Sequence, residues 1–92
     1  MYVLGGGETI RLVHCTIEAN ASDLDGAGMY CSMGASPLLI ACTIQKNVAG
    51  RNGGGIAFYG NLHNGYHLQL YNCDLLQNQA NQDGGALFFD TD

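Results

Sequence analysis

Residues 73–87 read CDLLQNQANQDGGAL, and the pattern of this stretch occurs twice more in the chain. It has a Cys, an Asn five residues later, a triplet of small residues that begins eleven residues after the Cys, and then one large apolar residue. The copies are Cys15, Asn20, 26–28 and Met29; Cys42, Asn47, 53–55 and Ile56; and Cys73, Asn78, 84–86 and Leu87. Because the three copies keep these offsets without a slip, the sequence predicts a repeat protein.

The repeats divide the chain into units of similar length. These units are 1–28, 29–55 and 56–86, with 87–92 opening a fourth. A period in this range is typical of a solenoid, in which each unit buries its apolar face against its neighbours. Met1 takes the position in its unit that Met29 takes in the next. Because this position is the last one of the Cys-to-apolar motif, the chain begins partway through a repeat of the motif, and we expect it to be a fragment or module of a longer protein.

Apolar residues alternate with other residues in three short stretches of each unit. The alternating pairs are Met1 and Val3, Met29 and Cys31, Ile56 and Phe58, and Leu87 and Phe89; then Cys15 and Ile17, Cys42 and Ile44, and Cys73 and Leu75; the third stretch ends at Leu12, Leu39 or Leu70. A period of two in short runs bounded by Gly and Asn is typical of β-strands. Three short strands per unit predict an all-β chain, a parallel β-helix of about three coils that is open at both ends.

In such a helix, equivalent residues of successive coils lie about 4.8 Å apart and form ladders. The apolar pairs above would form the inward ladders. A further ladder of Asn20, Asn47 and Asn78 is expected to place Asn in a left-handed backbone at a bend, with amides that hydrogen-bond from coil to coil. The small triplets begin at Gly26, Gly53 and Gly84. We expect them to permit positive φ or close packing at a corner.

The stretch GGAL at 84–87 resembles the GGA-plus-aliphatic motif of the polymorphic outer membrane protein repeats of chlamydiae. The second motif of that family, Phe-x-x-Asn, has an aliphatic residue in place of Phe at 17–20, 44–47 and 75–78. With these departures the chain is equally similar to the wider class of right-handed β-helix repeats, which includes pectate-lyase-like proteins. The resemblance implies a right-handed parallel β-helix from a secreted or surface-displayed protein, often an adhesin, and implies no catalytic activity.

The charge balance narrows the range of partners. Three Lys and Arg residues stand against eight Asp and Glu residues, for a formal net charge of −5. Phosphate binding needs clustered Lys and Arg, so nucleic acid is not an expected partner. The 92 residues contain no apolar stretch of membrane-spanning length, and 1–7 does not resemble a secretory signal.

Cysteines and carboxylates are the first candidates for chemistry. Cys15, Cys42 and Cys73 share one inward ladder, and parallel side chains suit disulfide geometry poorly. We expect buried free thiols, with a single disulfide as the alternative, and no metal, because a linear ladder is not tetrahedral. Asp25 and Asp83 each precede a triplet and would lie about 9.6 Å apart, too far to share a calcium ion, so turn capping is expected there.

Aromatic and imidazole groups are the candidates for binding. Tyr2, Tyr30 and Phe88 form an outward stripe that Ala57 interrupts, with Tyr59 nearby. Such a stripe can stack on sugar rings, or it can simply stabilise the sheet. His63 and His67 lie in or beside the longest insertion, 60–66, where protruding loops often carry binding residues and where an ordinary variable loop is the alternative.

These features predict a non-enzymatic structural or adhesive segment of a secreted or surface-exposed protein. Its candidate binding residues are Tyr2, Tyr30, Tyr59, His63 and His67, its expected partner is a glycan or a cell-surface protein, and no cofactor is expected. One alternative is the scaffold of a polysaccharide lyase or glycoside hydrolase whose active site lies in other coils. Another is a self-assembling element whose open ends bind flanking coils or further copies.

Overall fold

The computed structural model describes residues 1–4, 10–32, 36–60 and 68–91. Every regular element within these ranges is a β-strand, which confirms the all-β prediction. The strands are β1 (Tyr2–Leu4), β2 (Arg11–Val13), β3 (Thr16–Glu18), β4 (Ala21–Ser22), β5 (Met29–Ser32), β6 (Leu38–Ile40), β7 (Thr43–Gln45), β8 (Val48–Ala49), β9 (Ile56–Gly60), β10 (Gln69–Tyr71), β11 (Asp74–Leu76), β12 (Gln79–Ala80) and β13 (Leu87–Thr91).

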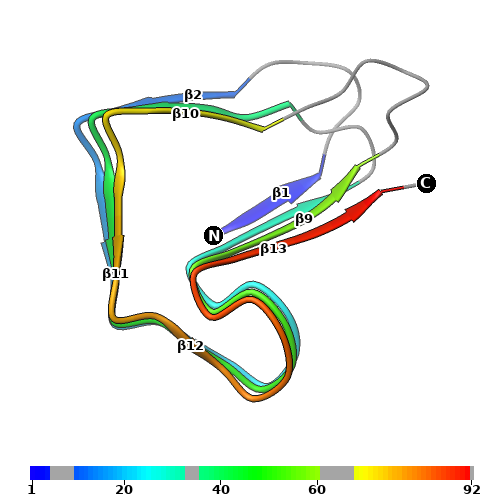
Figure 1. Ribbon diagram of the computed structural model, residues 1–92. Coiled ribbons are helices and arrows are strands. Elements are labelled where there is room, and N and C mark those ends of the chain that lie inside the picture. Colours follow the sequence, from blue (N-terminus) through cyan, green and yellow to red (C-terminus); the bar gives the residue numbers. More distant parts are fainter. Residues whose placement is uncertain (5–9, 33–35, 61–67, 92) are drawn as a thin grey trace.

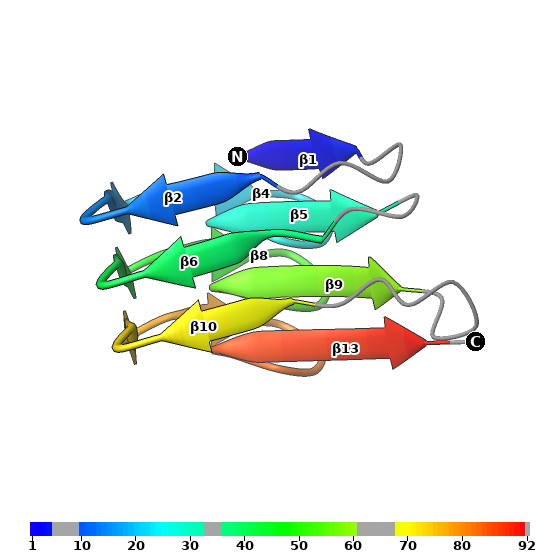
Figure 2. The same ribbon diagram turned by 90° about the horizontal axis from the view of Figure 1, so that it is seen from above.

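The strands form four parallel sheets, and each strand pairs with its equivalents in the neighbouring repeats (Figure 1). We call them sheet A (β1-β5-β9-β13), sheet B (β10-β6-β2), sheet C (β11-β7-β3) and sheet D (β12-β8-β4). Figure 1 looks along the stack, so that equivalent strands overlap, and Figure 2 shows them one above another. The repeat unit of the sequence is therefore one level of a stack of parallel strands.

The pairing register follows the offsets of the sequence motif. Leu39 pairs with Leu12 and Leu70 in sheet B, and Ile44 pairs with Ile17 and Leu75 in sheet C. These two predicted ladders are confirmed, as are Met29/Ile56/Leu87 and Val3/Cys31/Phe58/Phe89 in sheet A.

The prediction of three strands per repeat was wrong, because sheet D supplies a fourth. Its strands β4, β8 and β12 have two residues each, which is too short for an alternating pattern to appear in the sequence.

The core is centred on the middle repeat. The inward side chains that are 0–1% exposed come from the middle repeat and from β9, which opens the third repeat: Met29, Cys31, Leu39, Cys42, Ile44, Ile56 and Phe58. Their equivalents in the first and third repeats, such as Ile17 and Leu75, are only partly buried and pack against this centre. Burial of apolar side chains between successive levels is the main favourable term that holds the stack together.

Left-handed backbone makes the corners between sheets. The residues with positive φ are Ala19, Lys46 and Gln77, each directly before an Asn of the ladder, and His14, Ala41 and Asn72, each directly before a Cys. The expectation that the ladder asparagines themselves take this conformation was therefore wrong. The bend uses the preceding residue, so that Asn follows the corner and its side-chain amide hydrogen-bonds to the next level.

The small triplets provide both expected features, a positive φ and close packing, but at different glycines. Gly53, the first of its triplet, has a φ of +71°. A Cβ on Gly28, the third of its triplet, would lie 2.5 Å from the Gly55 carbonyl oxygen. Positive φ therefore explains the first glycine, and close approach of neighbouring repeats explains the third.

Candidate functional site

Three hook segments, 23–28, 50–55 and 81–86, connect sheet D to sheet A and curl beneath the outer face of sheet A (Figure 1). The first glycine of the triplet in a hook segment packs against an outward side chain of the strand that follows. A Cβ on Gly53 would lie 2.7 Å from Cβ of Ala57, and one on Gly84 would lie 2.8 Å from Cβ of Phe88. The hook segments therefore border the outward positions of sheet A.

A row of three aromatic rings follows this border, and we call Tyr30, Tyr59 and Phe88 the tyrosine face. The Tyr59 ring centroid lies 5.5 Å from that of Tyr30 and 5.8 Å from that of Phe88, with tilted ring planes. Ala57 is in register with both Tyr30 and Phe88, and Tyr59, two residues further along β9, supplies the ring between them. These distances are typical of favourable aromatic pairs.

Asp25 of the first hook segment fixes one of these rings. The Tyr59 hydroxyl donates a hydrogen bond to Oδ2 of Asp25, and the Asn52 main-chain N–H donates to Oδ1 at 3.0 Å. Arg51 Nε lies 3.7 Å from the same Oδ1. Because the Arg51 side chain is 51% exposed, this ion pair contributes little to stability. Asp25 therefore links the first hook segment to β9, the neighbour in sheet A of the strand β5 that this segment leads into.

The environment keeps the Tyr59 hydroxyl protonated. Desolvation, followed by the hydrogen bond to Asp25 and the charge of that carboxylate, raises the pKa of Tyr59 to about 12. The neutral hydroxyl is the form that can donate to a carboxylate. The link between Tyr59 and Asp25 is thus present at neutral pH.

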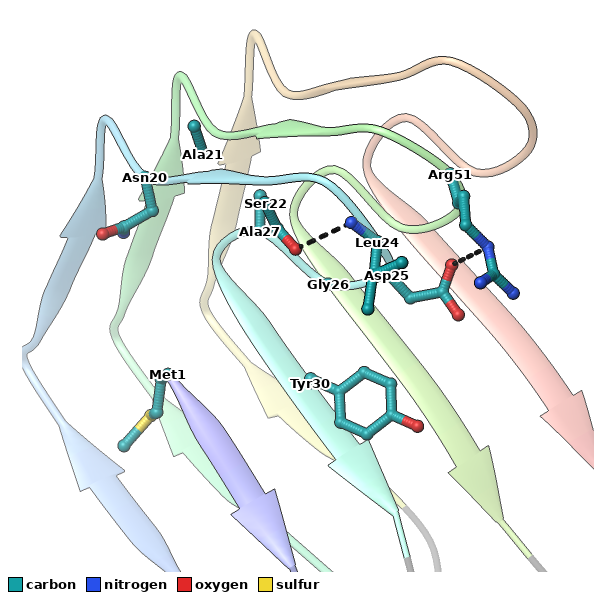
Figure 3. Close-up of a pocket in the computed structure, with 10 residues that line it drawn as sticks. All are labelled: Met1, Asn20, Ala21, Ser22, Leu24, Asp25, Gly26, Ala27, Tyr30 and Arg51. Carbon is teal, nitrogen blue, oxygen red and sulfur yellow. Dashed lines mark hydrogen bonds and ion pairs between the residues drawn. The ribbon is translucent and has the colours of Figure 1, made fainter.

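A hollow of about 490 Å³ lies beside the tyrosine face at the first repeat. Figure 3 shows the Tyr30 ring within it, with Leu24 and the Asp25–Arg51 pair at one side and Met1 at the other. Leu24 is 60% exposed. The hollow thus combines a flat ring, an apolar side chain, a carboxylate and a guanidinium, a mixture typical of small-molecule sites.

The residues directly before the triplets form a second ladder, which we call the capping ladder: Asp25, Asn52 and Asp83. Oδ1 of Asp25 accepts the Asn52 N–H, and Oδ1 of Asn52 accepts the Asp83 N–H, each at 3.0 Å. The expected capping role is confirmed for the Asp25 side chain, whereas Asp83 takes part through its main-chain N–H. A side-chain oxygen of one repeat caps the main chain of the next.

The Asn ladder is continuous through the three repeats. The main-chain N–H and Nδ2 of Asn20 both donate to Oδ1 of Asn47 at 3.0 Å, and those of Asn47 donate to Oδ1 of Asn78. Asn47 also donates from Nδ2 to the Ile17 carbonyl at 3.3 Å, and it is 0% exposed. Both the donor and the acceptor of this buried amide therefore have hydrogen-bond partners, as is usual for buried polar groups.

The cysteines are free thiols, as the ladder geometry predicts. Sγ of Cys42 donates to the carbonyls of Ile40 and Leu12 at 3.4 Å, and Cys73 repeats this arrangement one level on. Burial raises the pKa of the Cys31 thiol to about 12. A thiol that stays protonated is a poor nucleophile and metal ligand, so Cys31 acts as a packing residue.

The structure places the predicted binding residues unequally. Tyr30 and Tyr59 lie together in the tyrosine face, whereas His63 and His67 lie outside the described residues. The backbone of Tyr2 is in register with Tyr30, but its side chain also lies outside what the structure describes. The part that Arg51 plays could not be predicted, because a lone surface arginine is common and forms no sequence motif.

The described residues also bear on metal binding and on membrane insertion. In the described part of the chain, no three His, Cys, Asp or Glu side chains converge so that they could hold a metal ion. The same residues include no helix long and apolar enough to cross a membrane.

The geometry defines a class of protein, an all-β chain of stacked parallel strands with in-register side-chain ladders. Comparison of the chain with protein-family models, curated proteins and solved structures found no match.

Proposed function

We propose that this chain is a segment of a right-handed parallel β-helix from a secreted or surface-exposed protein, and that its tyrosine face binds a glycan. One observation carries the binding proposal, the row of ring centroids 5.5 and 5.8 Å apart on the outer face of sheet A. Flat aromatic surface with a polar edge suits the apolar faces and hydroxyl groups of sugar rings.

The right-handed winding is supported by two views taken together. In Figure 1 each repeat runs from sheet A through sheets B and C to sheet D in a counterclockwise sense, and Figure 2 places the later repeats nearer the viewer of Figure 1. That combination describes a right-handed turn. Connections between parallel strands take this hand almost always.

The polar groups beside the rings favour a neutral ligand and a non-catalytic role. Both carboxylate oxygens of Asp25 already accept hydrogen bonds, which suits positioning better than proton transfer. The half-exposed guanidinium of Arg51 can donate to a sugar hydroxyl. A net charge of −5 disfavours polyanionic glycans.

Titration with a panel of neutral oligosaccharides, followed by tyrosine fluorescence and NMR shifts, tests this function. Tyr30→Ala is expected to weaken binding by roughly tenfold, the equivalent of one lost aromatic stacking contact. Tyr71→Ala is the matched control, because Tyr71 is 53% exposed but lies on sheet B. Binding that is absent for the whole panel, or that Tyr71→Ala weakens equally, would rule the proposal out.

A further inference from the structure

Tyr30 and Tyr59 are two tyrosines whose rings contact each other on the outer face of sheet A. Their ring centroids lie 5.5 Å apart, and the ring planes are inclined by 39°. Tyr30 lies on β5 and Tyr59 on β9, which are the two inner strands of sheet A and pair with a strand on either side. The contact therefore belongs to the interior of the stack and joins two adjacent levels.

Ala57 makes this contact possible. Tyr30 is in register with Ala57 rather than with Tyr59. The small side chain of Ala57 leaves room for the Tyr59 ring, two residues further along β9, to lie between Tyr30 and Phe88. Phe88 has no phenolic hydrogen to lose. Tyr30 and Tyr59 are therefore the two rings of the tyrosine face that can be oxidised together.

Asp25 accepts the phenolic hydrogen of Tyr59. The Tyr59 hydroxyl donates to Oδ2 of Asp25, whose side chain is 9% exposed. Oδ1 of the same carboxylate accepts the Asn52 main-chain N–H at 3.0 Å, which fixes its orientation. A phenol that loses an electron becomes a strong acid, and a base within hydrogen-bond distance can take its proton at once. Tyr59 is therefore expected to be easier to oxidise than a tyrosine that has no carboxylate partner.

We propose that Tyr30 and Tyr59 form an oxidative cross-link, a carbon–carbon bond between their rings, when the protein meets a one-electron oxidant such as a peroxidase with hydrogen peroxide. The cross-link needs only the two rings and Asp25, so it is independent of glycan binding. The rings already lie in contact, so the bond forms without a rearrangement of the strands.

The reaction removes two electrons and two protons. Tyr59 loses one electron and passes its phenolic proton through Asp25 to solvent, while Tyr30, which is partly exposed, loses one electron and passes its proton to solvent. The two radicals join at ring carbons beside the carbons that carry the hydroxyl groups. The hydrogen on each joined carbon then moves, through solvent, to the phenolic oxygen. Hydrogen peroxide takes up the two electrons and two protons and becomes two water molecules.

The product has a covalent link between two levels of the stack. The four cysteines are free thiols and supply no such link. A bond between residues 30 and 59 closes a loop in the unfolded chain and lowers its entropy, as a disulfide does. Oxidation therefore stabilises the stack at the surface that carries the tyrosine face.

Oxidation of the 92-residue chain at high dilution tests the cross-link. A photo-activated ruthenium complex with persulfate is expected to give a monomeric product that is lighter by two hydrogen atoms and has the fluorescence of a bityrosine. Tandem mass spectrometry should locate the bond between Tyr30 and Tyr59. The same oxidation in urea is the control, because an unfolded chain brings its five tyrosines together at random. A Tyr30–Tyr59 share that is no larger in the folded chain than in urea would overturn the proposal.

Conservative variants assign the two rings. Tyr30→Phe and Tyr59→Phe each keep the ring and remove the phenolic hydrogen, so either is expected to abolish the intramolecular product. Tyr71→Phe is the matched control, since Tyr71 is 53% exposed but lies on sheet B. Circular dichroism checks that each variant folds. An intramolecular product that persists in folded Tyr30→Phe, or that is lost in Tyr71→Phe, would show that other rings react.

Asp25→Asn tests the proton acceptor. An amide oxygen can still accept the two hydrogen bonds of Asp25, but an amide does not take the proton, so cross-linking is expected to be at least about tenfold slower. Asp83→Asn removes the same charge at the equivalent position of the third repeat and should leave the rate unchanged. A solvent deuterium isotope effect that is lost in Asp25→Asn separates proton transfer from positioning. Equal rates for the two variants would contradict the role of Asp25.

Thermal melting of the purified product measures the effect on the stack. The cross-linked chain is expected to melt about 10 °C or more above the untreated chain, by analogy with a disulfide that closes a loop of similar length. A cross-linked chain that melts at the same temperature as the untreated one would show that the bond does not join levels of the folded stack.

Discussion

Leu39 and Leu12 are the same residue type and pair with each other in sheet B, yet Leu39 is fully buried and Leu12 only partly so. Ile44 and Ile17 show the same contrast in sheet C. The middle repeat has a neighbour on both sides, whereas the first repeat has one. Stability in this stack therefore comes from contacts between repeats more than from any repeat by itself, as expected for a linear array.

A charge in the middle of the stack should break this arrangement most completely. Ile44→Asp places an unpaired carboxylate at a fully buried position, and we expect a loss of more than about 4 kcal/mol, enough to unfold a small chain. Ile17→Asp leaves its charge near solvent and should cost less. Circular dichroism and thermal melting compare the two variants, and a native melting temperature for Ile44→Asp would contradict the ladder.

A bulky residue in a hook segment should also be more destabilising in the middle of the stack than near its end. A Cβ on Gly54 would lie 2.2 Å from the Gln79 carbonyl oxygen, whereas one on Gly85 would have its nearest contact at 3.2 Å, with the Asn78 carbonyl oxygen. Gly54→Val is expected to cost about 3 kcal/mol and Gly85→Val much less. Ala27 occupies the equivalent position in the first repeat, so Gly54→Ala should be milder. Urea unfolding measures all three, and equal losses for the two valine variants would contradict the packing.

The Asn ladder extends the comparison to polar groups. Asn47→Ala removes an amide that bonds to both neighbours and leaves their partners unpaired, which should cost about 2–3 kcal/mol. Asn20→Ala acts at the first end and should cost about 1 kcal/mol. If urea unfolding shows the same loss in the free energy of unfolding for both variants, the contribution of the ladder does not depend on having neighbours on both sides.

Alkaline pH should weaken the stack gradually. The pKa of Cys31 is raised to about 12 from 9.0 and that of Tyr59 to about 12 from 10.0, so between these values the folded state binds more protons than the unfolded state. Stability is therefore expected to be constant up to about pH 9 and to fall as pH rises towards about 12. Cys31→Ala should delay the onset to about pH 10, the range in which Tyr59 acts. Free energies from urea unfolding at pH 7 to 11 check this, and stability that rises above pH 9 would contradict it.

The strand pairing could be predicted because a stack pairs each residue with its own equivalent. The offsets alone therefore place Ile17 beside Ile44 and Ile44 beside Leu75. The fourth sheet could not be predicted, because two residues show no period. The left-handed backbone of Lys46 could not be predicted either, because this residue type does not favour it. The corner imposes the conformation, and the Lys46 N–H donates a hydrogen bond to the Leu76 carbonyl at 3.0 Å.

The candidate site was predicted only in part, for a related reason. Alternation along the strands places Tyr30 and Phe88 on one face, since both follow from strand register. The contact of Asp25 with Tyr59 joins residues 34 apart and depends on the path of a hook segment, which has no periodic pattern. Repeat offsets predict contacts between equivalent residues, but they do not predict contacts between residues at different positions of the repeat.

The most direct test of the stack is a nuclear Overhauser spectrum of the isotopically labelled chain. In-register pairing predicts side-chain contacts between Ile17 and Ile44 and between Ile44 and Leu75, with slow amide exchange in the strands of the middle repeat. A folded chain that lacked both contacts, or that paired Ile44 with residues at other offsets, would contradict the parallel stack on which the proposed function rests.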